Sequence, residues 1–291
     1  MIRDLFQQKK TVFSLEVFPP KKNSAIDTVY NTLAGLRDIP ADFISVTYGA
    51  GGSAAQKNKT GEIAGCIMRE YHFEPMAHLT CVGSSKEGIC QTLDELKALG
   101  IQNVLALRGD KNPDITGPMA FNYARDLTAF IKEREPGLHV AGACYPEGHG
   151  ECDSLEEGIS HLREKVAAGA EHLITQLFFD NDCFYAFMDR ALAAGISVPI
   201  QAGIMPIISK NQIERIVTMC GASLPRRFVS LINRYADAPE ALRDAGIAYA
   251  TEQIIDLLAN GARGIHLYTM NNMTTARRIN DNIRSIVDSD R

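Results

Sequence analysis

The segment V-F-S-L-E-V-F-P-P at residues 12–20 places one acidic residue, Glu16, in an otherwise apolar stretch. β-branched and aromatic residues favour a strand over Val12–Phe18, and Pro19 ends it because proline lacks the amide hydrogen of a ladder. Side chains alternate along a strand, so Glu16 lies opposite Leu15 and Val17. An ionised carboxylate is costly to bury alone, so Glu16 must be paired, hydrated or protonated with a raised pKa. The third state suits a general acid; closing a strand end against solvent or an arginine is the alternative.

Seven further strand-like segments follow, each ahead of a segment with helical spacing: Asp42–Tyr48, Pro75–Val82, Asn103–Arg108, His139–Tyr145, His172–Phe178, Pro199–Met205 and Gly264–Thr269. The polar residues at the ends of successive strands recur about every 30 residues, which is the length of one βα unit. Eight such units predict an α/β protein, a single-domain (β/α)8 TIM barrel over residues 1–291. A doubly wound open sheet is the alternative.

Local signals set several expected helix boundaries. Gly100 ends a helix that contains Leu93, Leu96 and Leu99, Ser154 begins another, and Gly169 ends it. Between strands 7 and 8 the spacing is about twice as long as elsewhere, and two helical segments are expected there, near 210–220 and 239–260. The barrel therefore carries an extra helical segment between its last two strands.

Alternation divides the strand residues into two sets. The apolar set is expected to pack against the outer helices, and the polar set to point inward. The apolar set contains Leu15, Val17, Ile44, Val46, Leu105, Leu107, Ile204, Ile265 and Leu267, and the polar set Ser14, Glu16, Ser45, Thr47, His78, Thr80, Arg108, Asp110, Tyr145, Glu147, Gln176, Gln201, His266 and Tyr268. A polar lining at the carboxyl ends of many strands predicts a functional cavity.

The residue types in this lining restrict its chemistry. Glu16 is one acid in an apolar setting, and Asp110 is a second carboxylate on a tight turn after Gly109; Arg108 and Asp110 as a plain ion pair is the alternative. No serine, cysteine or lysine stands beside an obvious base, and no carboxylate cluster indicates a catalytic metal. A planar ligand with many heteroatoms, assisted by a bound cofactor, fits better.

Composition excludes several other classes. The formal net charge of −5 offers no electrostatic case for nucleic acid or an anionic membrane, so a small-molecule partner is expected. No apolar run is long enough to span a bilayer and the first residues lack signal-peptide order, which predicts a cytoplasmic protein. Seven cysteines without a C-x-x-C pair indicate reduced thiols. A metal at Cys144, His149 and Cys152 lacks a fourth ligand at zinc spacing, so no metal is expected.

The glycines of G-x-G-x-x-A at residues 49–54 follow the second strand. Within a repeat of about 30 residues we interpret them as a flexible loop that lets a ligand approach the backbone. A dinucleotide-binding Rossmann turn is the alternative.

Ten collinear motifs resemble the methylenetetrahydrofolate reductases. They are F-S-L-E-V-F-P-P (13–20), S-V-T-Y-G-A-G-G (45–52), A-H-L-T-C (77–81), L-A-L-R-G-D (105–110), Y-A-R-D-L (123–127), Y-P-E-G-H (145–149), K-V-A-A-G-A (165–170), I-T-Q-L-F-F-D (174–180), G-I-M-P-I (203–207) and H-L-Y-T-M-N (266–271). They span nearly the whole chain, which looks like the short bacterial form, a catalytic barrel without a regulatory domain.

The resemblance implies a cytoplasmic FAD enzyme that reduces 5,10-methylenetetrahydrofolate to 5-methyltetrahydrofolate, with NAD(P)H as the electron donor. Glu16 would protonate the folate, Asp110 would tune charge near the flavin, and Gln176 and Tyr268 would hold the folate. The implied FAD-binding residues are Thr47, Tyr48, His78, Arg108, Gly109, Asp110, Tyr123, Ala124, Tyr145, His149 and Lys165. For Lys165 alone, a solvated helix lysine is the alternative.

Three positions depart from the family pattern. Lys210 stands near the place of an aromatic residue that stacks on NADH, Asn272 replaces an arginine that contacts the folate tail, and Gly158 replaces an acid that touches the cofactor. Two alternatives follow: a catalytic subunit that takes its electrons from a redox partner protein, and a folate-binding methyltransferase barrel without flavin. A homo-oligomer also stays open, as does the choice between NADH and NADPH.

Overall fold

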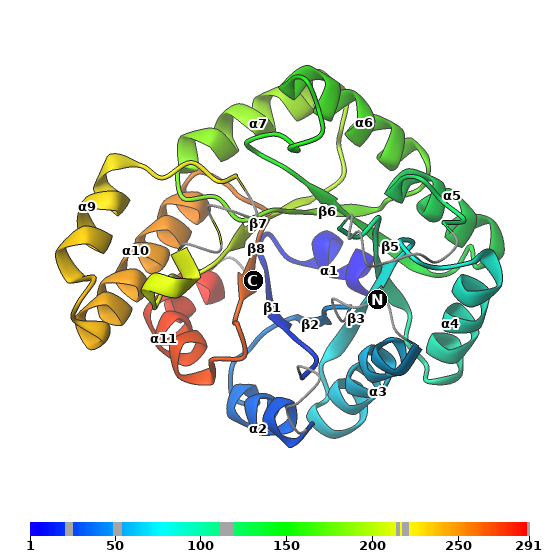
Figure 1. Ribbon diagram of the computed structural model, residues 1–291, viewed down its shortest axis with the longest axis horizontal. Helices are drawn as coiled ribbons and strands as arrows, with labels where there is room; N and C mark the ends of the chain where they lie inside the picture. Colours follow the sequence, from blue (N-terminus) through cyan, green and yellow to red (C-terminus); the bar gives the residue numbers. More distant parts are fainter. Residues whose placement is uncertain (21–25, 49–53, 111–118, 214–215, 217–220, 290–291) are drawn as a thin grey trace.

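The computed structural model describes residues 1–20, 26–48, 54–110, 119–213, 216 and 221–289. Eight parallel strands form a closed barrel in chain order, and the last strand pairs with the first (Figure 1). The strands are β1 (Val12–Val17), β2 (Phe43–Val46), β3 (Glu74–Thr80), β4 (Asn103–Leu107), β5 (His139–Cys144), β6 (His172–Thr175), β7 (Ile200–Ile204) and β8 (Gly264–Tyr268). The predicted (β/α)8 barrel and all eight strands are confirmed, and the open sheet is wrong.

Helices surround the barrel: α2 (Asp27–Leu36), α3 (Ala54–Tyr71), α4 (Lys86–Ala98), α5 (Ala124–Arg134), α6 (Leu155–Ala167), α7 (Asn181–Ala193), α10 (Pro239–Ala259) and α11 (Met273–Ser289). Ser154 caps α6 by accepting the amide hydrogen of Glu157, and Gly100 and Gly169 have positive φ after their helices, as predicted. None of the described helices is long and apolar enough to cross a membrane.

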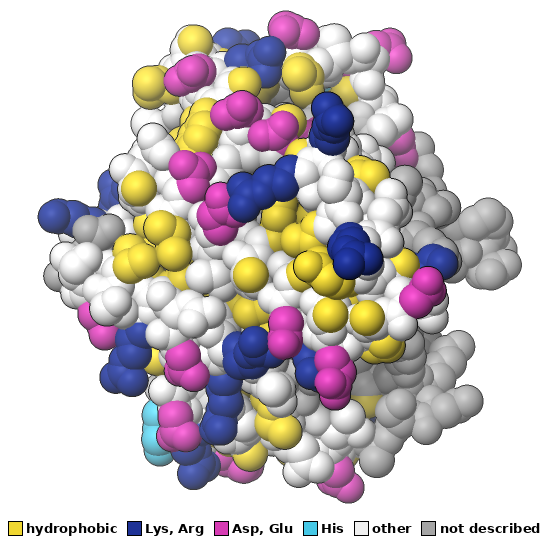
Figure 2. All heavy atoms as spheres, turned by 90° about the vertical axis from the view of Figure 1, so that its left-hand side faces the viewer, with side chains coloured by type: hydrophobic (Ala, Val, Ile, Leu, Met, Phe, Trp, Pro, Cys, Tyr) yellow, Lys and Arg dark blue, Asp and Glu magenta, His cyan; other side chains and the backbone are white. Residues whose placement is uncertain are grey.

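The connection from β7 to β8 is helical, as predicted. Residues 210–213 and 216 of the first expected segment are helical, and its other residues lie outside the described part of the chain. The second expected segment is α10. An additional helix, α9 (Arg226–Tyr235), was not predicted. The face over α9 and α10 carries acidic and basic side chains side by side, with no field of one sign (Figure 2).

The outward side chains of the strands pack against the helices in one large apolar cluster, as alternation predicts for most of the strands. The prediction is wrong for β4, where Leu105 and Leu107 point inward and Val104 and Ala106 face the helices. Every residue of β4 after Asn103 is apolar, so both faces look alike. The expected inward and outward directions on β4 were set by Arg108, and Arg108 lies beyond the end of the strand.

A short helix that the sequence did not indicate, α1 (Ile2–Gln8), lies inside the ring of strands at their amino ends (Figure 1). Ile2 and Phe6 pack with Val12 and Phe43 inside the barrel. The amide of Ile2 donates to Asn103 Oδ1 at 3.1 Å. In the described part of the chain, α1 therefore fills the amino end of the barrel.

We expect Phe6→Ala to lower the free energy of unfolding by about 3 kcal/mol, because it removes a buried ring from a closed packing layer. Phe6 is 5% exposed and its ring lies 5.2 Å from that of His172. Chemical denaturation measures the loss. Gln7→Ala on the same helix truncates an exposed side chain and should change stability by less than about 0.5 kcal/mol. Equal effects of the two variants would mean that α1 does not seal the barrel.

Candidate active site

Glu16 lies inside the barrel near the carboxyl end of β1, 5% exposed. Its Oε2 is 3.3 Å from Nε2 of His266 on β8 and 3.3 Å from Nε2 of His78 on β3. The hydroxyl of Ser45, which pairs with Glu16 in the β1–β2 register, donates to the same oxygen at 3.3 Å. Four neighbouring strands, β8, β1, β2 and β3, therefore converge on one carboxylate.

The surroundings of Glu16 set its ionisation. Burial raises the pKa of Glu16, but hydrogen bonding to His266 and His78 and their charge lower this pKa more strongly, to about 2. The predicted raised pKa is therefore wrong for the unliganded chain. Of the three states that the sequence allowed, the structure has the paired one, because two imidazoles from distant repeats reach the same oxygen.

This pairing predicts a pH-dependent stability. The pKa of Glu16 is lower in the folded chain than its ordinary value of 4.5, so the ionised carboxylate stabilises the fold above pH 4.5, and this contribution is lost as the pH falls towards 2. The shift corresponds to about 3 kcal/mol. We expect denaturation curves of Glu16→Gln to lack this part of the acid destabilisation. Parallel pH profiles for the two proteins would contradict the pairing.

Tyr268, at the end of β8, lies beside this cluster. Its ring meets that of His266 edge-on at 5.2 Å, and its hydroxyl donates to the carbonyl oxygen of Thr175 at 2.7 Å. Gly203 on β7 permits this path, since a Cβ there would stand 2.8 Å from the Tyr268 hydroxyl. Gln176 follows β6 and its Oε1 accepts the amide hydrogen of Leu177 at 2.9 Å. Both predicted folate residues thus lie at the carboxyl ends of strands, β8 and β6, which are separated only by β7.

A second polar group lies where β4 and β5 end. The guanidinium of Arg108 forms a bidentate pair with Glu151, with distances of 2.6 and 2.9 Å, and Glu151 raises the pKa of Arg108. The His149 ring meets that of Tyr145 edge-on at 4.7 Å, and His149 Nδ1 accepts the amide hydrogen of Glu151. Four predicted cofactor residues thus share this region: Arg108, Gly109, Tyr145 and His149.

The turn after β4 is as predicted, and the alternative of a plain ion pair between Arg108 and Asp110 is wrong. Gly109 has φ of +89°, and an added Cβ there would stand 3.3 Å from Val82. Asp110 is exposed. The partner of Arg108 is Glu151 and not Asp110. Glu151 was missed because a glutamate in a loop between strand and helix gives no sequence signal.

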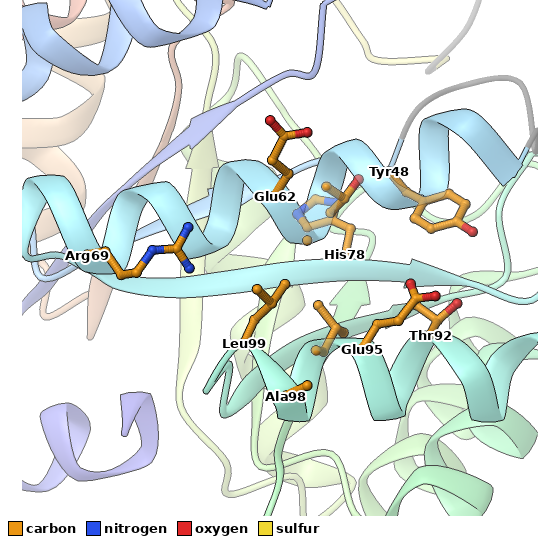
Figure 3. Close-up of a pocket in the computed structure, with 11 residues that line it drawn as sticks. Tyr48, Glu62, Arg69, His78, Thr92, Glu95, Ala98 and Leu99 are labelled. Carbon is orange, nitrogen blue, oxygen red and sulfur yellow. The ribbon is translucent and has the colours of Figure 1, made fainter.

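Other predicted cofactor residues lie away from the ends of β4 and β5. Tyr48 packs with the outer apolar cluster, and with His78 it lines a cavity of about 430 Å³ between α3 and α4, in which Glu95 and Arg69 also lie (Figure 3). Burial raises the pKa of the Tyr48 phenol. Thr47 follows β2, and its carbonyl oxygen accepts from the Thr60 hydroxyl. The glycine loop at 49–53 lies outside the described residues.

Lys165, Tyr123 and Ala124 are the remaining predicted cofactor residues. Lys165 reaches from α6 to β5, where its Nζ donates to the carbonyl oxygen of Ala143 at 2.5 Å, and burial lowers its pKa. It is therefore no solvated helix lysine. Tyr123 caps α5 with its backbone and is 53% exposed, and Ala124 is the first residue of that helix.

One of the departures from the family pattern, Asn272, has a local explanation, and nothing in the structure explains the glycine at 158. Asn272 Oδ1 accepts the amide hydrogen of Thr275 in the first turn of α11. An added Cβ at Gly158 would meet nothing within 4 Å. Lys210 is exposed. Among the described residues, no group of three His, Cys, Asp or Glu side chains is placed to hold a metal ion.

The family model for methylenetetrahydrofolate reductase matches residues 1–284. The chain belongs to the methylenetetrahydrofolate reductase family. It is 31% identical to 5,10-methylenetetrahydrofolate reductase of Escherichia coli, over 89% of this chain and 86% of that protein. It is 35% identical to methylenetetrahydrofolate reductase 1 of Schizosaccharomyces pombe over 97% of this chain, and to an NADH-named reductase of Arabidopsis thaliana over 93%. The chain spans about half the length of these fungal and plant reductases.

A solved structure has the same fold. It is a Clostridium thermocellum protein that binds two copies of 5-methyl-5,6,7,8-tetrahydrofolic acid, with a TM-score of 0.66 and 15% identity over 99% of both chains. At this identity the likeness concerns the fold alone.

Proposed function

We propose that this chain reduces 5,10-methylenetetrahydrofolate to 5-methyltetrahydrofolate with FAD as its cofactor and Glu16 as the acid. The observation that carries the proposal is a buried carboxylate between two imidazoles, at the carboxyl end of the barrel, in a chain of this family. The flavin, when bound, supplies hydride transfer from a nicotinamide to the folate.

The residues at the ends of β4 and β5 fit a flavin nucleotide. Arg108 is a bidentate donor suited to phosphate, and its present partner Glu151 is 41% exposed, so exchange of that partner is not blocked by burial. Tyr145 and His149 offer aromatic faces and polar atoms beside it. The positive φ of Gly109 brings the backbone to the same edge.

Other proposed cofactor residues would bind from further out. Thr47, Tyr48 and His78 would act from the β2 and β3 side and Tyr123 and Ala124 from the start of α5. Lys165 would have to exchange its bond to the Ala143 carbonyl for one to the cofactor.

Glu16 would transfer a proton to the bridging nitrogen of the folate and remain as a carboxylate. Since Glu16 is ionised in the unliganded chain, the cluster of Glu16, His78 and His266 must take up one proton when folate binds. Imidazole donors to Oε2 stabilise the charge that appears on Glu16 as its proton leaves, which favours the transition state over the ground state. Asp110 would adjust charge near the flavin, and Gln176 and Tyr268 would hold the folate.

The test is a visible spectrum of the purified protein, followed by anaerobic addition of NADH and then of methylenetetrahydrofolate. Flavin bands that bleach with NADH and return with the folate would support the whole proposal. Protein that stays colourless after addition of FAD would contradict it and favour a folate-binding barrel without flavin.

A protein electron donor is the second candidate, because the resemblance puts Lys210 near the place where many bacterial family members carry an aromatic residue that stacks on NADH. This candidate would be favoured if NADH and NADPH do not reduce the flavin, while dithionite reduces it and the folate reoxidises it. Prompt turnover with either nicotinamide would exclude it.

A further inference from the structure

A line of hydrogen bonds begins at the amino-end rim of the barrel, below the proposed site. Glu171 Oε2 is 2.5 Å from His139 Nδ1, and His139 Nε2 is 2.8 Å from His172 Nδ1. The two imidazoles are fully buried and stack at 4.9 Å with an angle of 6°. Lys132 and Arg3 form ion pairs with Glu171 at 2.8 and 3.2 Å.

The charge states of Glu171, His139 and His172 determine which atom donates in each of these hydrogen bonds. Burial raises the pKa of Glu171, but His139 and Lys132 lower it to about 2, so the carboxylate only accepts. Burial lowers the pKa of both His139 and His172, so each ring is neutral and carries one hydrogen. His139 donates from Nδ1 to Glu171, and His172 therefore donates from Nδ1 to His139. Nε2 of His172 is then a bare acceptor.

A second line starts at Gln201 on β7, which is fully buried. Its amide nitrogen faces the backbone carbonyls of Val12 and Ile265, at 3.2 and 3.4 Å, and the Ser14 hydroxyl at 3.1 Å. Because carbonyls only accept, the amide cannot be turned around. The oxygen Oε1 of Gln201 therefore points away from them, as a second buried acceptor.

The second line of hydrogen bonds continues from Gln201 to Glu16. Ser14 accepts from Gln201, and its oxygen lies 2.7 Å from His266 Nδ1, against 3.4 Å to the Ile265 carbonyl. If the hydroxyl donates along the shorter of these two contacts, its hydrogen points to Nδ1 of His266. The ring hydrogen of a neutral His266 is then on Nε2, which faces Oε2 of Glu16 at 3.3 Å.

The two lines approach each other on neighbouring strands. Ile174 pairs with Gln201 in the β6–β7 register, and His172 is the next inward residue below Ile174. His172 Nε2 and Gln201 Oε1 are both buried without a hydrogen-bond partner among the described residues. Two acceptors cannot bond to each other, so each needs a donor, and one group that donates two hydrogens would serve both. Water is the smallest such group, and buried waters commonly serve unpaired polar atoms.

We propose that one buried water donates to both His172 Nε2 and Gln201 Oε1, and that the completed line holds His266 in the tautomer that presents Nε2–H to Glu16. The role of this line rests on the proposed function. Gln201 is a positioning residue, since it acts on Glu16 through Ser14 and His266, and His172 acts only by holding the water on the Gln201 oxygen. The hydrogen bond from His266 strengthens as Glu16 gives up its proton, so the locked tautomer assists the folate half-reaction and has no part in flavin reduction.

The first test needs neither cofactor nor substrate. Nitrogen-15 NMR of the histidine rings in the wild-type chain should show the hydrogen on Nδ1 of His172 and on Nε2 of His266, and a crystal structure at atomic resolution should show a water between His172 and Gln201. A hydrogen on Nε2 of resting His172, or direct contact between the two side chains, would overturn the proposal.

The second test uses Gln201→Met, which keeps the side-chain length but removes both hydrogen-bonding groups. His266 should then populate both tautomers, and the folate half-reaction should slow roughly three- to tenfold, the worth of one hydrogen bond. Flavin reduction by the electron donor should not change. Gln253→Met is the matched control: Gln253 is also buried and donates to the Phe178 carbonyl, outside the line.

The outcomes separate the two proposals. Wild-type tautomers together with a wild-type folate half-reaction in Gln201→Met would overturn the role of the line. Equal slowing by Gln253→Met would do the same, by showing that any buried amide matters. If the wild-type chain with bound flavin does not reduce the folate, the proposed function fails, whereas the ring-nitrogen signals still decide whether the water joins the two lines.

Discussion

Glu16→Gln should leave the reduction of the flavin by its electron donor intact and slow the reduction of methylenetetrahydrofolate by roughly a hundredfold or more, the usual contribution of a positioned proton donor. Glutamine keeps the size of the side chain and can accept from Ser45 and His266, but it has no proton to give to the folate nitrogen. Anaerobic stopped-flow spectroscopy follows each half-reaction separately at the flavin bands.

Asp42→Asn is the matched control for this experiment. Asp42 is a buried carboxylate paired with Lys9, and its side chain accepts the Phe13 amide hydrogen, away from the proposed site. It should leave both half-reactions unchanged. If Glu16→Gln folds but loses both half-reactions, Glu16 serves the cofactor; if it loses neither, the acid is another group.

The barrel itself was predictable because it is repetitive. Eight strand-like segments at a spacing of about 30 residues require only local propensities and alternation, and both are encoded within each unit. The alternation of side chains along β2 also indicates the direction of Tyr48. Tyr48 has the parity of Ile44 and Val46, and the structure accordingly packs it outside the barrel, although the family resemblance placed it among the cofactor residues.

What the sequence could not provide is the distance between side chains of different units. His266 was expected to point inward, but only the closure of β8 on β1 brings it to Glu16, and with His78 it reverses the direction of the predicted pKa shift. The helix α1 has seven residues, too few for a periodic signal. β4 is apolar on both faces, so its sequence does not show which of its side chains point into the barrel.

Arg108 and Glu151 should affect FAD binding in opposite directions. In the unliganded chain Glu151 accepts from both terminal nitrogens of the Arg108 guanidinium, and in the proposed complex this guanidinium contacts the cofactor. Arg108→Ala should therefore weaken FAD binding roughly ten- to hundredfold, as expected for a lost charged hydrogen bond. Glu151→Gln removes the competing charge and should leave FAD binding equal or tighter.

Quenching of FAD fluorescence on titration with apoprotein measures both affinities, and Arg108→Lys tests whether the fork geometry is needed in addition to the charge. The pair could instead only anchor the loop that carries His149 and Glu151 to the end of β4. In that case Arg108→Ala and Glu151→Gln break the same contact and weaken FAD binding to a similar extent. Effects of the same sign would therefore remove Arg108 from the proposed cofactor site, whereas opposite effects would show that FAD and Glu151 compete for one guanidinium.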